Sequence, residues 1–295
     1  MDIKRYLDQK RRQVEEALAQ YSPAAAGRLA DHIKAMHYSL FVGGKRVRPI
    51  LCLATAEAVH GRAETALPAA CALEYIHTYS LIHDDLPAMD NDDLRRGNPT
   101  NHKIFGEAGA ILAGDSLLTF AFDLLSGPEL AAVPAEHRLR VVNIIARAAG
   151  PLGMVGGQAL DIASEGKKIS LEALQFIHHY KTGALITAAV QTGAVLGGAD
   201  QAQFEALTRY GQNIGLAFQI VDDLLNVEGT AAQLGKAAGS DAARQKATYP
   251  AFFGPAVTRA KAGEAVTAAV AALADFDQEA APLRAIAQYI MTRQK

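Results

Sequence analysis

The sequence predicts an all-α protein, a single helical bundle around a central cavity. Alanine-rich stretches whose apolar residues recur with a period near 3.6 run from end to end, whereas β-branched runs bounded by turns are scarce. The chain has 295 residues, 50% of them hydrophobic, and no long linker or repeat interrupts it. We therefore expect one domain over residues 1–295, with about ten or more helices around one core.

The first polar element along the chain is a basic turn, GGKRVRP, at residues 43–49, directly before a helix-like stretch at 50–59. Glycine lets the backbone approach an anion closely, and Lys and Arg supply charge-assisted hydrogen bonds. The segment is not a Walker loop, because Ser39 replaces the first glycine of that motif and Arg46 replaces its Ser or Thr. It indicates a phosphate-binding turn, with a basic surface turn as the alternative.

A helical segment follows in which His77, Leu81 and Asp84 share one face. This spacing points His77 along the same wall as the first carboxylate of the next motif. We interpret His77 as a ligand contact; the alternative is a core histidine that is simply hydrogen-bonded.

The most informative segment is HDDLPAMDNDDLRRG at residues 83–97, with five aspartates and two arginines. Asp84 and Asp85 close an apolar run and Pro87 cannot continue a helix, so the cluster lies at a helix-to-loop transition, at a cavity mouth. Repulsion among these carboxylates requires a cation, and oxygen ligands without Cys or His at metal spacing favour Mg²⁺. The alternative is a solvated acidic loop.

A second acidic site occurs far along the chain, in FQIVDDLLN. An apolar helical face there is formed by Leu207, Tyr210, Ile214, Phe218, Val221 and Leu225. One polar patch stands out on this helix: Gln219, Asp222, Asp223 and Asn226. Uncompensated carboxylates there would be unfavourable, so the pattern predicts either a metal or a salt bridge.

Two acidic sites and several separate basic ones fit a ligand that carries a diphosphate. The basic residues are Lys45 and Arg48, Arg95 and Arg96, Lys181, and Lys236. One diphosphate would be held through Mg²⁺, and a second, bound by Lys and Arg alone, would react with it. This is the logic of a two-substrate transferase.

These motifs resemble those of the short-chain trans-prenyl diphosphate synthase family, most closely bacterial farnesyl diphosphate synthases. HDDLPAMDNDDLRRG and FQIVDDLLN are similar to its two aspartate-rich motifs, and GGKRVRP to its amino-terminal motif. Further segments match in order: GMVGGQALDI (153–162), HHYKTGALI (178–186), LGKAAGSD (234–241) and KATYP (246–250). The resemblance covers about residues 40–250. It implies an isoprenoid-synthase-type helical bundle and a homodimer.

The resemblance also implies a role for each matched residue. Mg²⁺ ligands would be Asp84, Asp90 and Asp222, supported by Asp85 and Asp223, for about three ions per site. The allylic diphosphate would contact Arg95, Lys181 and Lys236. Isopentenyl diphosphate would contact Gly44, Lys45, Arg48, His77 and Arg96. Lys181 would also act in catalysis with Thr182 and Gln219, the last two facing the developing carbocation.

The implied reaction is ionisation of dimethylallyl or geranyl diphosphate, attack by the double bond of isopentenyl diphosphate, and loss of a proton. No side-chain nucleophile is required, which agrees with the absence of a credible Ser/His/Asp or Cys/His set. The chain departs from the family at Asn226, where a third aspartate is usual. A neutral oxygen ligand there puts tight metal binding at the second site in doubt.

Product length is predicted from Tyr79 and Ser80, about one turn before Asp84. An aromatic residue at the fifth position before the first aspartate, together with the extra residues Pro87 and Ala88, resembles farnesyl diphosphate synthases. We therefore predict farnesyl diphosphate as product, with a geranylgeranyl diphosphate synthase as the alternative. Tyr79 as plain core packing stays open.

Composition excludes other classes of function. A net charge of −2 and a pI near 6.5 offer no field for nucleic acid. Cys52 and Cys71 in apolar contexts, and a charged amino terminus without a secretory signal, predict a cytoplasmic protein with reduced thiols. The uncharged stretch 182–199 holds too many threonines and glycines for a membrane span and is expected to be a buried helix.

The stretch 227–250 mixes Gly, Ala and Lys and predicts a lid that closes over the diphosphates, with an ordinary surface loop as the alternative. Two rival functions remain open. A terpene cyclase should lack the isopentenyl site, yet Lys45, Arg48 and His77 are present. A noncatalytic helical partner of a synthase would be free to lose its aspartates, and this chain keeps the motifs apart from Asn226.

Overall fold

Helices make up nearly all of the regular structure in the computed structural model, which describes residues 1–228 and 247–293. The α-helices are α1 (Ile3–Tyr21), α2 (Ala30–Phe41), α3 (Val47–Ala58), α4 (Ala63–Asp84), α5 (Asn101–Ser126), α6 (Ala135–Ala149), α7 (Met154–Ser164), α8 (Leu171–His178), α9 (Ala184–Gly197), α10 (Gln201–Glu228), α13 (Tyr249–Ala271) and α14 (Ala281–Thr292). Short helical turns are η1 (Gly27–Leu29), η2 (Pro128–Leu130), η3 (His179–Gly183) and η4 (Gln278–Ala280). The all-α prediction is confirmed.

The strands in the described ranges form one small antiparallel hairpin between α4 and α5. It consists of β1 (Leu94–Arg95) and β2 (Asn98–Pro99), with Arg95 opposite Asn98. The hairpin follows the acidic loop and carries both arginines of the first motif.

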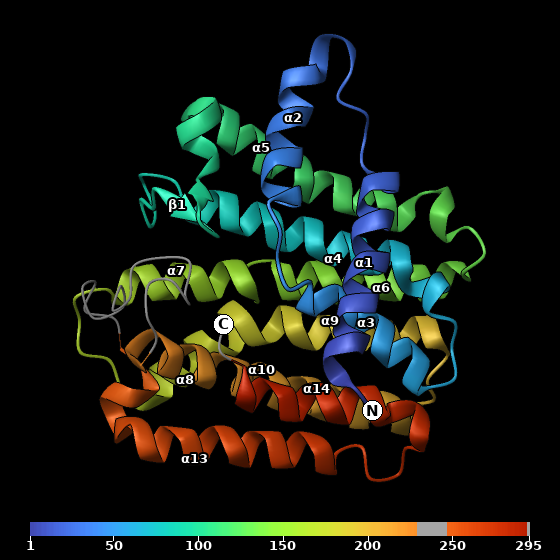
Figure 1. Ribbon diagram of the computed structural model, residues 1–295, viewed down its shortest axis with the longest axis vertical. Coiled ribbons are helices and arrows are strands. Elements are labelled where there is room, and N and C mark those ends of the chain that lie inside the picture. Colours follow the sequence, from blue (N-terminus) through green and yellow to red (C-terminus); the bar gives the residue numbers. More distant parts are fainter. Residues whose placement is uncertain (229–246, 294–295) are drawn as a thin grey trace.

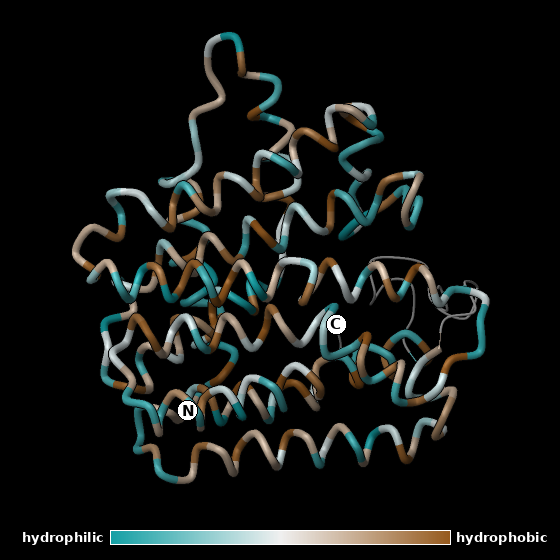
Figure 2. The backbone as a smooth tube through the Cα atoms, turned by 180° about the vertical axis from the view of Figure 1, so that it is seen from behind, coloured by the Kyte–Doolittle hydropathy of each residue, from teal (hydrophilic) through white to brown (hydrophobic). Residues whose placement is uncertain are grey.

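Most helices lie in stacked rows, with α5 near the top and α13 at the bottom, while α1 and α2 run across these rows (Figure 1). Helices α3, α4 and α9 form the centre: α3 packs on both α4 and α9, and α9 packs on α10. Hydrophobic and polar residues alternate along the outer helices, as expected for elements that bury one face (Figure 2). One hydrophobic core extends from Val14 of α1 to Ile290 of α14.

Small residues set the spacing at the centre of the bundle. A Cβ atom on Gly193 of α9 would lie 2.1 Å from the backbone oxygen of Cys52 in α3, and one on Gly197 would lie 2.9 Å from Cα of Ala56. The two backbones therefore approach more closely than larger side chains would allow. The uncharged stretch 182–199 is largely this helix, and residues 185–190 are all buried, as predicted.

One helical stretch in the described ranges, Asn101–Leu130, is long and apolar enough by composition to cross a membrane, a test that the core helix of a globular protein also passes. In its most apolar window 39% of the residues are buried. The uncharged stretch considered above as a possible membrane span, residues 182–199, is a different one.

The basic turn is shorter than the sequence suggested. Helix α3 begins at Val47, not at residue 50, because proline is tolerated in the first helical turn and Pro49 occupies that turn. Arg48 therefore lies on the helix and not on the turn. Helix α4 ends at Asp84, so the predicted helix-to-loop transition is where the sequence placed it.

Candidate active site

A cavity of about 1150 Å³ runs between α3, α4, α7, α8, η3 and α10. The predicted site residues that line it are Gly44, Lys45, Arg48, His77, Tyr79, Ser80, Asp84, Asp90, Arg95, Arg96, Lys181, Thr182, Gln219, Asp222 and Asp223. Asp85, predicted in a supporting role, lines a smaller pocket that shares Arg95 and Arg96 with this cavity. Lys236, and most of the stretch interpreted as a lid, lie outside the described residues. Residues as far apart in the sequence as Lys45 and Asn226 therefore line one cavity.

The end of α4 brings the first two predicted metal ligands together. The backbone N–H of Asp90 donates to the carbonyl of Asp84 at 2.8 Å, so the loop after Pro87 folds back onto the helix end. Burial raises the pKa of Asp84 to about 6, with the charge of Asp90 adding to the rise and Lys181 opposing it. An ionised carboxylate in this position is stabilised by a cation.

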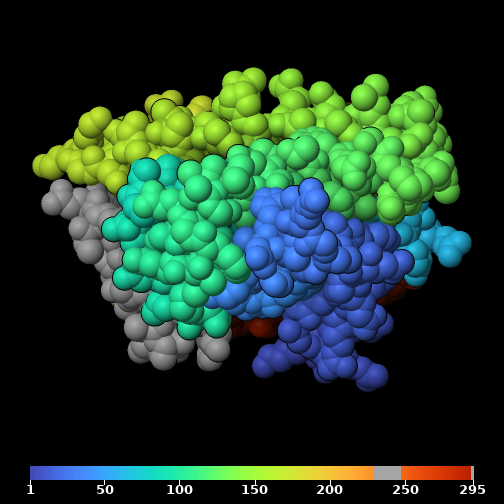
Figure 3. Space-filling view, turned by 90° about the horizontal axis from the view of Figure 1, so that it is seen from above, coloured from blue at the N-terminus to red at the C-terminus, as the bar shows by residue number. Residues whose placement is uncertain are grey.

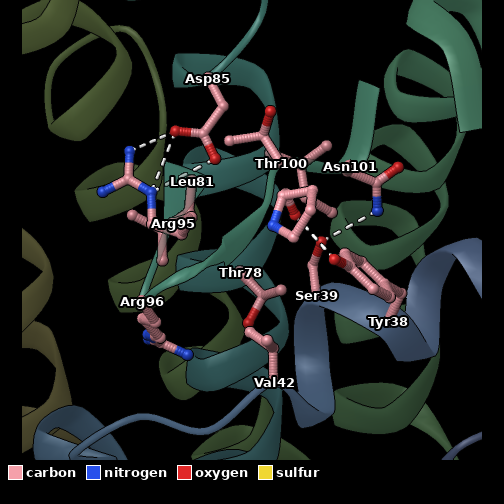
Figure 4. Close-up of a pocket in the computed structure, with 12 residues that line it drawn as sticks. Tyr38, Ser39, Val42, Thr78, Leu81, Asp85, Arg95, Arg96, Thr100 and Asn101 are labelled. Atoms are coloured by element: carbon pink, nitrogen blue, oxygen red, sulfur yellow. Dashed lines mark hydrogen bonds and ion pairs between the residues drawn. The ribbon is translucent and has the colours of Figure 1, made fainter. Parts of the chain in front are cut away.

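The second aspartate of the motif faces a different partner. Asp85 is buried and accepts from Nε of Arg95 at 3.0 Å, and the guanidinium also contacts it through Nη2 (Figure 4). Arg95 lies on β1, so the hairpin is tied to the end of α4 by a buried ion pair. Asp85 therefore holds Arg95 at the cavity edge.

The second acidic site lies on α10 across the cavity. Asp222 Oδ1 accepts from Nη2 of Arg293 at 2.8 Å, and the Arg293 guanidinium stacks 4.0 Å from the centroid of the Phe218 ring. Asp223 is buried and accepts from the backbone N–H of Tyr249 at 2.9 Å and from Nε2 of Gln219 at 3.0 Å. The salt bridge that the sequence left as an alternative to a metal is present at Asp222, to a residue that no motif pointed to.

The donor set fits Mg²⁺. Within the described residues, no group of three His, Cys, Asp or Glu side chains is already assembled for a metal. The carboxylates of Asp84, Asp90 and Asp222 nevertheless line the same cavity, and burial disfavours the charge on Asp84. Mg²⁺ is typically bound by one or two carboxylates together with substrate phosphates and waters, and such a site does not need a complete protein cage.

A π-helical turn carries the next two predicted residues. In η3 the Nζ atom of Lys181 lies 2.6 Å from Oδ2 of Asp161 on α7, and Oγ1 of Thr182 donates to Oε1 of Gln219 at 2.8 Å. A π-helical turn often marks a functional site because it re-aims side chains. Here it turns Lys181 toward α7 and Thr182 toward α10.

Two further residues of this region were missed by sequence reasoning. Asp161 lies within a matched motif, and its distance from Lys181 in sequence gave no pairing signal. His178 is buried, stacks on Tyr249 with ring centroids 5.5 Å apart, and its pKa is lowered to about 4 by burial. The imidazole is therefore neutral near pH 7.

Cations line the part of the cavity around the basic turn, called the cation wall below. Burial lowers the pKa of Arg48 to about 10, and that of His77 well below its usual value, with the charges of Arg48 and Arg96 adding to the effect on His77. His77 thus contributes a neutral imidazole beside permanent cations. Arg96 donates to the carbonyl of Gly43 and closes the turn from the hairpin side.

The predicted floor lies one turn before Asp84. Tyr79 is 6% exposed, and its ring meets that of His83 edge-on with centroids 5.6 Å apart. Nε2 of His83 donates to the carbonyl of Ile111 at 3.0 Å, and Gly114 leaves the space for this ring, since a Cβ there would lie 2.2 Å from Nε2. Ser80 donates back to the carbonyl of His77 at 2.9 Å.

Comparison with known proteins places this chain in a family. The polyprenyl synthetase family profile matches residues 31–288. A farnesyl diphosphate synthase from Geobacillus stearothermophilus is 47% identical over 293 residues, covering 99% of this chain and 98% of its own. A geranylgeranyl diphosphate synthase from Cyanophora paradoxa is 50% identical, covering 98% and 95%. The crystal structure of an FPP/GFPP synthase from Zymomonas mobilis superposes with a TM-score of 0.88 at 39% identity, over 98% of this chain and 99% of that one. The chain belongs to the polyprenyl synthetase family of prenyltransferases.

Proposed function

We propose that this prenyltransferase is a short-chain prenyl diphosphate synthase that condenses isopentenyl diphosphate with dimethylallyl or geranyl diphosphate to give farnesyl diphosphate. The observation that carries the proposal is a single cavity with two carboxylate sites, a wall of cations, and a tyrosine beneath the first carboxylates. One diphosphate substrate would be held at the carboxylate sites through Mg²⁺, and the other would be held by the cations directly.

The allylic diphosphate would lie between Asp84, Asp90 and Asp222, the residues that would hold Mg²⁺. Bound Mg²⁺ would neutralise charge on this diphosphate and so favour its departure. Lys181 and Arg95 line the same space and would donate to its oxygens. Their present partners, Asp161 and Asp85, would keep them oriented toward that position.

Isopentenyl diphosphate would lie against Gly44, Lys45, Arg48, His77 and Arg96. These residues give charge-assisted hydrogen bonds without a metal, and Arg offers two parallel donors to a phosphate. The double bond of this substrate would then point across the cavity toward the allylic carbon.

The chemical step needs stabilised charge and no nucleophile from the protein. The allylic C–O bond breaks and the diphosphate leaves with its electron pair; the double bond then attacks the cation, and a proton is lost to the departed diphosphate. The hydrogen-bonded pair of Thr182 and Gln219 presents oxygen dipoles to the positive charge as it develops. Asn226 adds a neutral oxygen to the second acidic site and would bind metal more weakly than a carboxylate.

The floor supports a fifteen-carbon product. Tyr79 is packed against His83, which is itself fixed to α5, so the ring is braced against displacement by a growing chain. A geranylgeranyl diphosphate synthase is the second candidate, because similar proteins carry both names. A cyclase is disfavoured by the cation wall, and a noncatalytic partner by the retained carboxylates.

We also propose a cytoplasmic homodimer. The free thiols of Cys52 and Cys71 are buried, as expected of reduced cysteines. Helix α5 exposes three large apolar side chains, Ile104, Ile111 and Leu112, each at least 42% exposed. A kink at Gly106 separates Ile104 from the other two, and the three together are called the α5 row. Figure 3 shows the surface where α5 lies between α2 and the α6–α7 segment. A second copy covering this row would bury it.

The test is incubation of the purified protein with labelled isopentenyl diphosphate, dimethylallyl or geranyl diphosphate, and Mg²⁺, followed by separation of the dephosphorylated alcohols. Farnesol is the expected product from both starters, and EDTA should abolish it. Geranylgeraniol would overturn the product length and keep the chemistry. Absence of any product would favour the cyclase or the noncatalytic partner.

A further inference from the structure

The turn between α2 and α3 is held by arginines from two sides. Nη1 of Arg46 donates to Oε1 of Glu74 at 2.7 Å, and its Nη2 donates to the carbonyl of Leu40, the next-to-last residue of α2, at 2.7 Å. On the other side Arg96 donates to the carbonyl of Gly43. A Cβ on Gly44 would lie 2.8 Å from the Arg96 guanidinium, so the glycine permits this close approach.

The backbone at Arg46 is unusual. Its φ of 52° is left-handed, a conformation that non-glycine residues adopt only when the surrounding structure imposes it. The same residue caps α3, and its carbonyl accepts from the N–H of Ile50 at 3.0 Å. The side-chain contacts of Arg46 therefore fix the direction in which α3 leaves the turn. Lys45 precedes Arg46 by one residue, and Arg48 follows it by two.

The ion pair between Arg46 and Glu74 is buried. Arg46 is 2% exposed and Glu74 is 1% exposed. Burying charges is costly unless each has a partner of good geometry. Here the Arg46 guanidinium meets the Glu74 carboxylate and the Leu40 carbonyl, and its Nε atom lies 3.8 Å from a carboxylate oxygen of Glu15. Glu74 also lies one helical turn before His77 on α4. The pair thus links the cation-bearing turn to the helix that carries His77.

Glu74 offsets part of the positive charge around the basic turn. Its carboxylate acts on Arg48 and Arg96, raising the pKa of each against the lowering by burial. Asp222 acts in the same direction on Arg48 and Asp85 acts so on Arg96, so carboxylates of both acidic sites help to stabilise these cations beside the cavity. The wall can therefore assemble before a diphosphate arrives.

We propose that Arg46 and Glu74 are positioning residues for the isopentenyl diphosphate site: their buried ion pair sets the turn so that Lys45, Arg48 and His77 face one ligand. This inference rests on the proposed function. The Arg46–Glu74 ion pair lies beside the cations of the isopentenyl diphosphate site and not beside the predicted metal ligands. It should therefore affect the binding of isopentenyl diphosphate and not that of the allylic substrate.

The decisive variant is the double substitution Arg46→Met/Glu74→Met. Removing both charges avoids leaving one of them buried and unpaired, and such replacements are often neutral for stability. We expect the KM for isopentenyl diphosphate to rise roughly tenfold or more, because a displacement of about 1 Å of binding groups is costly. The KM for geranyl diphosphate and the kcat should stay within about twofold. An equal rise in both KM values, or no rise in either, would overturn the proposal.

Two further variants complete the test. Arg46→Lys keeps the charge but loses the fork, and should give an intermediate KM for isopentenyl diphosphate even if the double variant fails to fold. The control, Lys10→Met/Glu57→Met, removes another ion pair, in which Lys10 is buried and Glu57 is partly exposed, and which joins α1 to α3 away from the cavity. It should leave both KM values unchanged, and thermal melting should show all variants folded.

Calorimetric titration with inorganic pyrophosphate in EDTA separates this inference from the proposed function. The double variant should bind pyrophosphate about tenfold more weakly than the wild type, whatever the product of the enzyme is. Weaker binding in a protein that makes no prenyl product would sustain the positioning role and defeat the proposed function. Unchanged pyrophosphate binding in an active enzyme would do the reverse.

Discussion

At the scale of single residues, one carboxyl group links the chemistry of the site to the stability of the protein. Asp84 ends a buried helix, and the desolvation there raises its pKa from 3.8 to about 6 in the metal-free protein. The folded state therefore holds a proton between about pH 4 and pH 6 that the unfolded state has lost. Stability rises as the pH falls through this window and is lowest where Asp84 is ionised.

The first prediction follows from the direction in which stability changes with pH. In EDTA, the free energy of unfolding of Asp84→Asn minus that of the wild type should increase between about pH 5 and pH 6, by roughly 1 kcal/mol per pH unit at most, and level off by about pH 7. Urea titrations at several pH values measure it. Asp93→Asn is the control: Lys103 lowers the pKa of that exposed carboxyl, so its contribution should not change over this range. A pH-independent difference for Asp84→Asn would contradict the assignment of the pKa.

The second residue-scale prediction concerns the floor. Tyr79→Ser should shift the product from farnesyl to geranylgeranyl diphosphate, because removing the ring opens space beneath Asp84 for a longer chain. His83→Ala should cause a smaller shift in the same direction, since it removes the edge-on contact and the tie to Ile111 but leaves the tyrosine in place. Chromatography of the alcohols measures both, and farnesol alone from Tyr79→Ser would count against a floor at this position.

At the scale of elements, glycines decide how closely helices approach the π-helical turn. A Cβ on Gly157 of α7 would lie 2.2 Å from the backbone nitrogen of Lys181, and one on Gly215 of α10 would lie 2.8 Å from Cα of Gly183. Helices α7 and α10 therefore clamp η3 from two sides. The positions of Lys181 and Thr182 depend on this clamp.

The third prediction tests one side of the clamp. Gly157→Ala should lower kcat at least tenfold, because the added carbon pushes the backbone of Lys181 away from its present position. Gly263→Ala on α13 is the matched control: nothing lies within 4 Å of an added Cβ there. It should keep full activity and stabilise the protein by about 0.5–1 kcal/mol. Full activity in Gly157→Ala would show that the clamp does not position Lys181.

At the scale of the whole molecule, α5 and α13 lie at opposite sides of the bundle (Figure 1), and both expose apolar side chains. The row on α5 is the one proposed to contact a second copy. The fourth prediction is that Leu112→Asp on α5 gives a monomer by light scattering, whereas Val257→Asp on α13 leaves the dimer intact. Monomers in both variants, or dimers in both, would argue against an α5 interface.

The sequence alone determined the fold class and many, but not all, of the residues that line the cavity. The 3.6-residue period requires helices with one buried face, and Pro87 requires α4 to end beside Asp84. Both signals are local, so no knowledge of the packing was needed. The paired spacing of Gln219, Asp222 and Asn226 likewise placed them on one face, and all three line the cavity.

Tertiary structure alone decided the partners of these residues. Asp222 pairs with Arg293, Lys181 with Asp161 and Arg46 with Glu74 across 71, 20 and 28 positions. Nothing in the local pattern connects such residues, because the pairing depends on how whole helices pack. For the same reason, the sequence did not predict the close approach of Gly157 to Lys181 or the hydrogen bond from His83 to Ile111 of α5. A sequence pattern sets which face of a helix is buried, but only the packed bundle sets what each buried group meets there.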